Sequence, residues 1–279
     1  MEYALKWWEN TCMEKHLSLP ELAVLEDDGD QETIYLKMQT ALEVMRQAAE
    51  EGFDPDRRSM SGLTGGQAFK YREALLNGKT ATRGMLGRAG ARALAIAECN
   101  AVMGRIVAAP TAGACGILPA LLLTLQEDYG FSDRQLCDGL IVAGVVGDVI
   151  ANRASVSGAQ GGCQAECGSA AAMAAAAAVY LRGGSVKQVF DAAGFALMNV
   201  MGLVCDPVQG LVEVPCVFRN VSGVAGALVA ADLALAAIPC PIPPDEVIDA
   251  MKQVGDALPP SLRETGEGGC AACPSMCKR

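Results

Sequence analysis

The segment Ser169–Leu181 constrains the fold more than any other feature of the sequence, because eight of its thirteen residues are alanine. Alanine loses no side-chain entropy in a helix, and its small side chain lets neighbouring helices approach closely. The run is shorter than the ~20 apolar residues that are needed to cross a bilayer. We therefore predict a helix that is buried in the core of the protein.

The rest of the chain also favours helices. Apolar residues at three- and four-residue spacing predict an amphipathic helix over 32–51 that ends near Gly52. Small residues without β-branched runs predict a closely packed helix over 83–105, which Pro110 stops. Two-residue alternation is scarce, and further helices are predicted over 117–125, 133–152, 185–201, 221–238 and 245–254. We expect an all-α protein with a single helical domain (1–258), packed through Ala and Gly faces, and a Cys-rich tail (259–279).

Charge and hydropathy narrow the class of function. A net charge of -10 argues against a broad nucleic-acid-binding face, which needs a basic patch, while 51% hydrophobic residues supply a core. The apolar stretch 221–238 is interrupted by Asp232, so helix packing explains it better than membrane insertion. The amino terminus carries charged residues and no signal-peptide core. We expect a cytoplasmic protein that acts on a small molecule.

The twelve cysteines fall into distinct sets. Cys12, Cys99, Cys137 and Cys240 stand alone in helical or turn contexts and are predicted to be small buried apolar residues. By contrast, Cys163, Cys205 and Cys216 each lie at a helix boundary beside Gly or Pro. Such neighbours let a chain wrap around an iron–sulfur cluster and leave amide groups free to bond its sulfides.

Three ordered motifs carry a family resemblance: APTAGACG at 109–116, SGAQGGCQ at 157–164 and CDPVQGLVEVPC at 205–216. They resemble the α-part of bacterial iron–sulfur L-serine dehydratases. The resemblance implies a [4Fe–4S] cluster held by Cys163, Cys205 and Cys216, with one iron open to bind the hydroxyl of L-serine. A Lewis-acidic iron would stabilise the departing hydroxide, and the resulting aminoacrylate would yield pyruvate and ammonia.

The carboxylate and ammonium groups of the substrate also need residues that bind them, and the candidates lie in loops. The amides of Thr111, Ala112 and Gly113, in the loop 111–116, are predicted to bind a carboxylate. Polar residues beside Gly-rich turns are predicted to complete the pocket: Ser61, Asn152, Ser155 and Ser157. Lys70 and Glu166 are interpreted as solvated, His16 as structural or on the surface, and the general base is left unassigned.

The resemblance also implies a regulatory tail and a partner. In some family members a carboxyl-terminal cysteine occupies the open iron, and Cys277 is the candidate by position, although Cys270 and Cys273 compete and form a C-x-x-C pair. The Ser-Ser-His-Thr-like segment of the family's β-part is absent from this sequence. We therefore expect a separate β-chain that completes the active site, and an oligomer.

Two other functions fit the same residues. One is a related cluster-dependent lyase that acts on cysteine or another β-substituted amino acid. The other is a non-catalytic iron–sulfur redox sensor, which the tail cysteines favour. A pyridoxal enzyme is less attractive, because no lysine motif identifies a Schiff-base partner.

Overall fold

The computed structural model describes residues 3–27 and 29–277, and of Cys277 it describes only the backbone. Within these residues every regular element is helical, and the extended pairing is limited to an isolated bridge between Cys205 and Arg263. The prediction of an all-α protein is therefore confirmed. The longer helices are α1 (Leu5–Lys15), α2 (Leu19–Glu26), α3 (Gln31–Glu51), α4 (Gln67–Leu76), α5 (Gly84–Ala101), α6 (Ile117–Tyr129), α7 (Asp133–Arg153), α9 (Ser169–Leu181), α10 (Val186–Met198), α11 (Cys216–Leu235) and α12 (Pro244–Ala257). Short turns are α8 (Gly158–Gly161), α13 (Pro274–Cys277), the 3₁₀ helices η1 (Ala112–Ala114), η3 (Val208–Gly210), η4 (Pro260–Leu262) and η5 (Gly269–Ala272), and the π-helical turn η2 (Gln164–Gly168).

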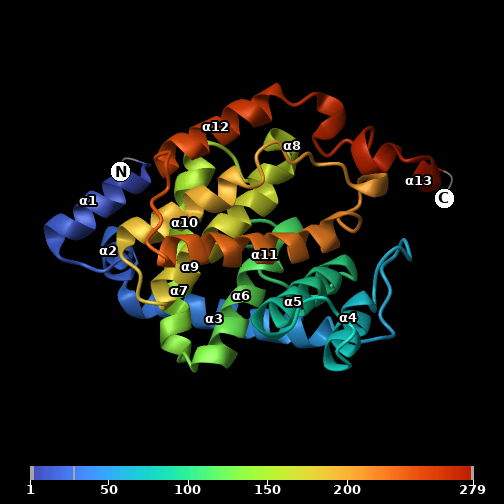
Figure 1. The fold of residues 1–279 in the computed structure, drawn as a ribbon, viewed down its shortest axis with the longest axis horizontal. Helices are drawn as coiled ribbons and strands as arrows, with labels where there is room; N and C mark the ends of the chain where they lie inside the picture. Colours follow the sequence, from blue (N-terminus) through green and yellow to red (C-terminus); the bar gives the residue numbers. More distant parts are fainter. Residues whose placement is uncertain (1–2, 28, 278–279) are drawn as a thin grey trace.

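The alanine-rich helix α9 forms the centre of the molecule, with the bounds that its composition predicts. It packs against α6, α7, α10 and α11, and its residues from Ser169 to Val179 are all buried. Figure 1 shows α9 near the middle of the molecule, with α12 along one side and α3 along the opposite side. Because alanine side chains are short, several helices can surround α9 at close range.

Local signals set several helix starts. Ser132 and Ser185 each accept a bond from the backbone amide three residues later, and the glutamine at that position bonds back, which forms a capping box. With these caps, α7 begins at the predicted residue, and α10 begins one residue later than predicted.

Two helices differ from expectation. Helix α11 begins at Cys216 and not near residue 221, because Pro215 occupies its N-cap position and the chain turns helical directly after it. Helix α4 was not predicted. Its N-cap, Gly66, has a positive φ of 77° and no side chain that could cap the helix. The local sequence therefore contains no N-cap signal for α4.

Helices α7 and α11 are long and apolar enough to cross a membrane by length and composition alone. In the structure α7 packs against α9, α3 and α2, and α11 packs against α5, α9 and α10. Packing within a helical core accounts for the apolar character of both.

The solitary cysteines largely follow their predicted burial. Cys12, Cys99 and Cys137 are buried, whereas Cys240 is half-buried. These four thiols belong to helix packing and not to the three loops described next.

Candidate active site

The three boundary cysteines come from separate segments and are all buried. Cys163 lies between α8 and η2, Cys205 lies in the loop after α10, and Cys216 is the first residue of α11. Their exposed fractions are 1%, 3% and 5%. The fold therefore removes all three thiols from solvent.

The three thiols lie close enough to act on one another electrostatically. Burial raises the pKa of Cys216 to about 12, and the neighbouring charge of Cys163 adds to the rise. Burial, followed by the charge of Cys163, likewise raises the pKa of Cys205. As free thiols, Cys205 and Cys216 are thus neutral at pH 7, and a positive charge is needed to ionise them.

A fourth cysteine, Cys167, contacts Cys163. Their Sγ atoms are 3.3 Å apart and share one hydrogen bond. This bond, together with the Arg219 guanidinium, lowers the pKa of Cys163 and so favours its thiolate. Both cysteines lie at the π-helical turn η2, and π-turns inside helices often mark functional sites.

The predicted carboxylate-binding turn does hold a carboxylate, that of Glu166. Thr111 Oγ1 donates to Glu166 Oε1 at 2.5 Å, and the Gly113 backbone also bonds to this carboxylate. Burial is the main reason that the pKa of Glu166 is raised. The interpretation of Glu166 as a solvated residue is therefore wrong, because a contact with a loop 55 residues away withdraws it from water.

Gly158 lets the backbone approach both Cys205 and Glu166 closely. A Cβ atom placed on Gly158 would lie 2.8 Å from Cys205 Sγ and 3.5 Å from Glu166 Oε2. A side chain at this position would therefore collide with one group of the site and contact the other.

Asn220 joins the loop 111–116 to the first turn of α11. Its Oδ1 accepts from the Gly116 amide at 2.8 Å, and its Nδ2 donates to the carbonyls of Gly113 at 2.7 Å and Cys216 at 2.9 Å. Asn220 is fully buried. This side chain fixes the carboxylate-binding turn beside Cys216.

Ser61 reaches the loop 205–216 through a buried carboxylate. Ser59 and Ser61 both donate to Glu213 Oε2, at 2.6 and 2.5 Å. Behind them Glu98 accepts from the amides of Gly65, Gln67 and Ala68, each at 3.0 Å, which fixes the end of the loop and caps α4. The predicted residue Ser61 therefore lies next to the loop that carries Cys216.

The remaining predicted substrate residues are more scattered. Ser157 precedes Gly158 and lies at the edge of the site. Ser155 bonds to Gln160, and Asn152 is exposed and bonds to Asp148 within α7, so these bonds do not join either residue to the three boundary cysteines. Ala112 is exposed on the same turn as Thr111. Their assignment as substrate ligands stays a prediction, and Lys70 is exposed as expected.

The tail is bonded to the loop that carries Cys205. The Cys205 amide donates to the Leu262 carbonyl at 2.9 Å, and the Glu264 amide donates to the Cys205 carbonyl at 2.7 Å. Further along, the Cys270 amide donates to Asp206 Oδ2 at 2.6 Å. These bonds place Cys270 near the site, whereas the side chain of Cys277 lies outside the described residues.

Arg219 connects several of these groups. It forms an ion pair with Asp206 at 2.7 Å and donates to the Val204 carbonyl at 2.8 Å. Its charge also acts on Cys163. A single guanidinium thus lies among a boundary cysteine, its neighbouring loop and the residue that holds the tail.

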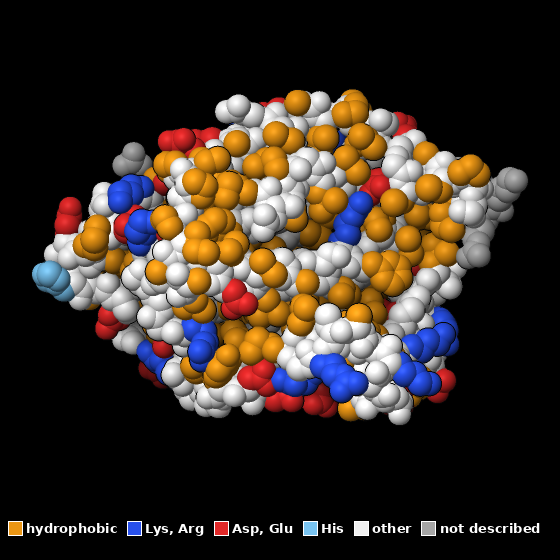
Figure 2. Space-filling view, viewed as in Figure 1, with side chains coloured by type: hydrophobic (Ala, Val, Ile, Leu, Met, Phe, Trp, Pro, Cys, Tyr) orange, Lys and Arg blue, Asp and Glu red, His pale blue; other side chains and the backbone are white. Residues whose placement is uncertain are grey.

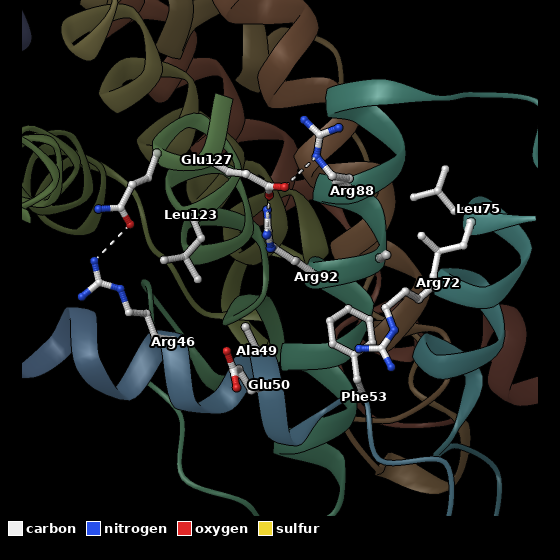
Figure 3. A pocket seen from close by; sticks show the side chains of 13 residues that line it. Arg46, Ala49, Glu50, Phe53, Arg72, Leu75, Arg88, Arg92, Leu123 and Glu127 are labelled. Carbon is white, nitrogen blue, oxygen red and sulfur yellow. Dashed lines mark hydrogen bonds and ion pairs between the residues drawn. The ribbon is translucent and has the colours of Figure 1, made fainter. Parts of the chain in front are cut away.

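A hollow of about 670 Å³ lies elsewhere, between α3, α4, α5 and α6, and Figure 3 shows the four arginines that line it. Arg46 donates to Gln126 at 3.0 Å, and Arg88 and Arg92 pair with Glu127 at 3.6 and 2.5 Å. Arg72 lies over the Phe53 ring. None of the predicted site residues lines this hollow, and its paired arginines do not form an anion site.

The cysteine site is not built for a single metal ion. Among the described residues, no three His, Cys, Asp or Glu side chains converge closely enough to hold one ion. The ligands of an iron–sulfur cluster bind different irons, so they stand further apart than the ligands of one ion.

Comparison with known proteins gives the family. The family model for the serine dehydratase alpha chain matches residues 3–271. The chain belongs to this family. It is 45% identical over 266 residues to the probable L-serine dehydratase alpha chain of Bacillus subtilis, with 94% of this chain and 88% of the relative covered. It is 42% identical to the L-serine dehydratase alpha chain of Peptoniphilus asaccharolyticus, with 94% and 91% covered.

Some members of the family are longer. The L-serine dehydratase TdcG of Escherichia coli is 42% identical over 181 residues, which cover 64% of this chain and only 40% of that protein. A serine dehydratase alpha-chain region therefore occurs both as a protein of this size and as part of a longer chain.

Proposed function

We propose that this chain is the catalytic α-chain of an L-serine dehydratase, which converts L-serine to pyruvate and ammonia with a [4Fe–4S] cluster on Cys163, Cys205 and Cys216. One observation carries the proposal. Three buried thiols from distant segments act electrostatically on one another, and the turn that holds the carboxylate of Glu166 belongs to the same region. The names of the similar alpha chains agree with this substrate.

The residues fit such a cluster chemically. Thiolates are the ligands that iron–sulfur clusters need, and a bound metal would favour the thiolates of Cys205 and Cys216, whose pKa values burial raises. Pro215 and Gly162 stand next to two of the cysteines, and Gly158 lets the backbone pass close to the third. Three ligands, and not four, leave one position of the cluster for substrate.

The protein residues then orient and enclose the substrate. When bound, the cluster supplies a Lewis acid for the departing hydroxyl group. The hydroxyl of Thr111 and the backbone of Gly113 hold the carboxylate of Glu166 in place. The second oxygen of Glu166 lies near Gly158, and there it would pair with the ammonium group of an amino acid. Fixing the ammonium group of serine helps to align the bonds that break.

A separate β-chain, oligomerisation and a cytoplasmic location belong to the same proposal. The designation of the relatives as alpha chains supports a second chain. We expect the purified α-chain alone to retain little turnover and the β-chain to restore it.

The test is anaerobic reconstitution of the full chain, followed by iron and sulfide analysis and a pyruvate assay with and without a β-chain. Cys163→Ser, Cys205→Ser and Cys216→Ser should each lose the cluster, whereas the matched variant of a buried helix cysteine, Cys137→Ser, should keep it. Normal clusters in all three site variants would refute the ligand assignment.

Substrate identity needs its own comparison. L-serine, L-threonine and L-cysteine are supplied in parallel, and product release is measured for each. Turnover of cysteine but not of serine would favour the related lyase. A reconstituted cluster whose electron-resonance signal responds to none of the three would favour a redox sensor.

A further inference from the structure

The contact between Cys163 and Cys167 has a use beyond the proposed dehydration. Residues four apart in a helical turn have Cα atoms about 6 Å apart, which is within the range that a disulfide bridges. Their Sγ atoms are 3.3 Å apart, so only a small rotation of the side chains separates this contact from a bond. Cys167 itself is buried and takes no part in the proposed ligand set.

Cys167 is reached from a different side of the molecule. A pocket of about 530 Å³ lies between the loop after α10 and the first turns of α11, and Cys167 forms part of its lining, whereas Cys163 does not. Met201, Arg219 and Ser222 line the same pocket. Figure 2 shows the face over α11, on which apolar side chains predominate and few charges interrupt them. A small neutral molecule that enters this pocket therefore lies on the Cys167 side of the cysteine pair.

We propose that Cys167 and Cys163 form an intramolecular disulfide site that reacts with hydroperoxides. The Cys163 sulfur attacks one oxygen of hydrogen peroxide, the O–O bond breaks, and a sulfenic acid and water result. The Cys167 sulfur then attacks the sulfenyl sulfur and displaces a second water. In total, two thiols and one hydrogen peroxide give one disulfide and two waters, so sulfur is oxidised and peroxide is reduced.

This reaction competes with cluster binding because it consumes Cys163. A disulfide is reversed by thiol reductants, whereas oxidation of a thiol to the sulfinic state is not. The pair therefore keeps Cys163 in a recoverable form while no cluster protects it. The inference concerns the thiols of the chain and does not depend on serine as the substrate.

The experiment uses the full chain, stripped of metal by a chelator under reductant and then exposed to limiting hydrogen peroxide. Trypsin cleaves after Arg153 and Arg182, and the peptide 154–182 contains Cys163 and Cys167 as its two cysteines. We expect this peptide to become about 2 Da lighter and to resist iodoacetamide until dithiothreitol is added. If both thiols instead accept iodoacetamide after peroxide, or if Cys163 is found linked to another cysteine, the proposal fails.

Variants extend the test. Cys167→Ala and Cys167→Ser should leave Cys163 to gain oxygen atoms irreversibly, and they should recover less iron after dithiothreitol treatment and reconstitution than the wild type. Cys137→Ala removes a buried cysteine elsewhere and should keep the lighter peptide. Because peptide mapping of the wild type needs no variant, a misfolded variant does not remove the test.

The outcome is separable from that of the proposed function. A chain that forms the disulfide but releases no pyruvate would overturn the dehydratase and leave this site intact. A chain that is an active dehydratase but shows two free thiols after peroxide would overturn only this inference.

Discussion

Replacement of Asn220 by alanine should destabilise the chain strongly, even though the residue lies outside the predicted ligand set. The side chain is fully buried and bonds to Gly116, Gly113 and Cys216 at 2.8, 2.7 and 2.9 Å. The Cys216 carbonyl also lies within α11 and keeps a helical partner. The amide of Gly116 and the carbonyl of Gly113 lose a buried partner, at about 1–3 kcal/mol each. The expected total is about 2–6 kcal/mol.

The assay is urea unfolding of the metal-free protein, followed by circular dichroism, with iron content after reconstitution as a second readout. The matched variant is Asn77→Ala, which removes an exposed hydrogen bond to the Glu73 carbonyl. We expect Asn77→Ala to cost less than about 1 kcal/mol. If Asn220→Ala costs no more than Asn77→Ala, the idea that this side chain holds the turn against α11 is refuted.

Three further substitutions test other parts of the structure. Gly158→Ala should lower the iron content after reconstitution, because its methyl group would lie 2.8 Å from Cys205 Sγ. The control is Gly226→Ala, whose methyl group would lie in open space on α11. This variant should keep its iron and add about 0.5–1 kcal/mol to the free energy of unfolding. Glu98→Gln should cost about 1–3 kcal/mol in urea unfolding and speed trypsin cleavage in the loop before α4, because an amide nitrogen cannot accept the bonds that the carboxylate accepts. The hydrogen bond that Arg46 on α3 donates to Asp133 holds the pKa of this carboxyl group below its ordinary value. This stabilisation is therefore complete above the unfolded pKa of about 3.9 and is lost as the pH falls through the lower folded pKa. Asp133→Asn should reduce stability by less than about 1 kcal/mol near neutral pH and by progressively less as the pH falls below the unfolded pKa, as measured by urea unfolding across that range.

The parts of the fold that the sequence predicts are those with local causes. Helix α9 follows from its alanines and has the predicted bounds, and α7 and α10 begin at capping boxes formed by neighbouring residues. Helix α4 escapes prediction because its amides are capped by Glu98, which lies about thirty residues later in the chain. A cap from a distant residue leaves no mark in the local sequence.

The site shows the same division. The three boundary cysteines can be singled out from the sequence because their Gly and Pro neighbours and ordered motifs are visible there, while their role as cluster ligands stays a prediction. Glu166 was misread because the tendency of glutamates to be solvated gave the wrong answer where Thr111, far away in the chain, binds the carboxylate. No local motif marks Asn220 or Arg219 as part of the site. Their contacts are with loops that come near them only in the folded chain.

The loops of the site have a common physical requirement that explains where these polar residues lie. Segments rich in Gly, Ala and Pro have few side chains with which to satisfy their own backbone groups, and buried amides without partners are costly. A buried polar side chain outside each loop meets this need: Glu98 for the loop before α4, Asn220 for 113–116, and Gln164 for the amide of Gly202 at 2.8 Å. Because each such side chain serves one loop, a substitution there should loosen that loop while the packing around α9 persists. The geometry of the cysteine site therefore depends on single buried polar groups, whereas the fold depends on the many apolar contacts of the helices.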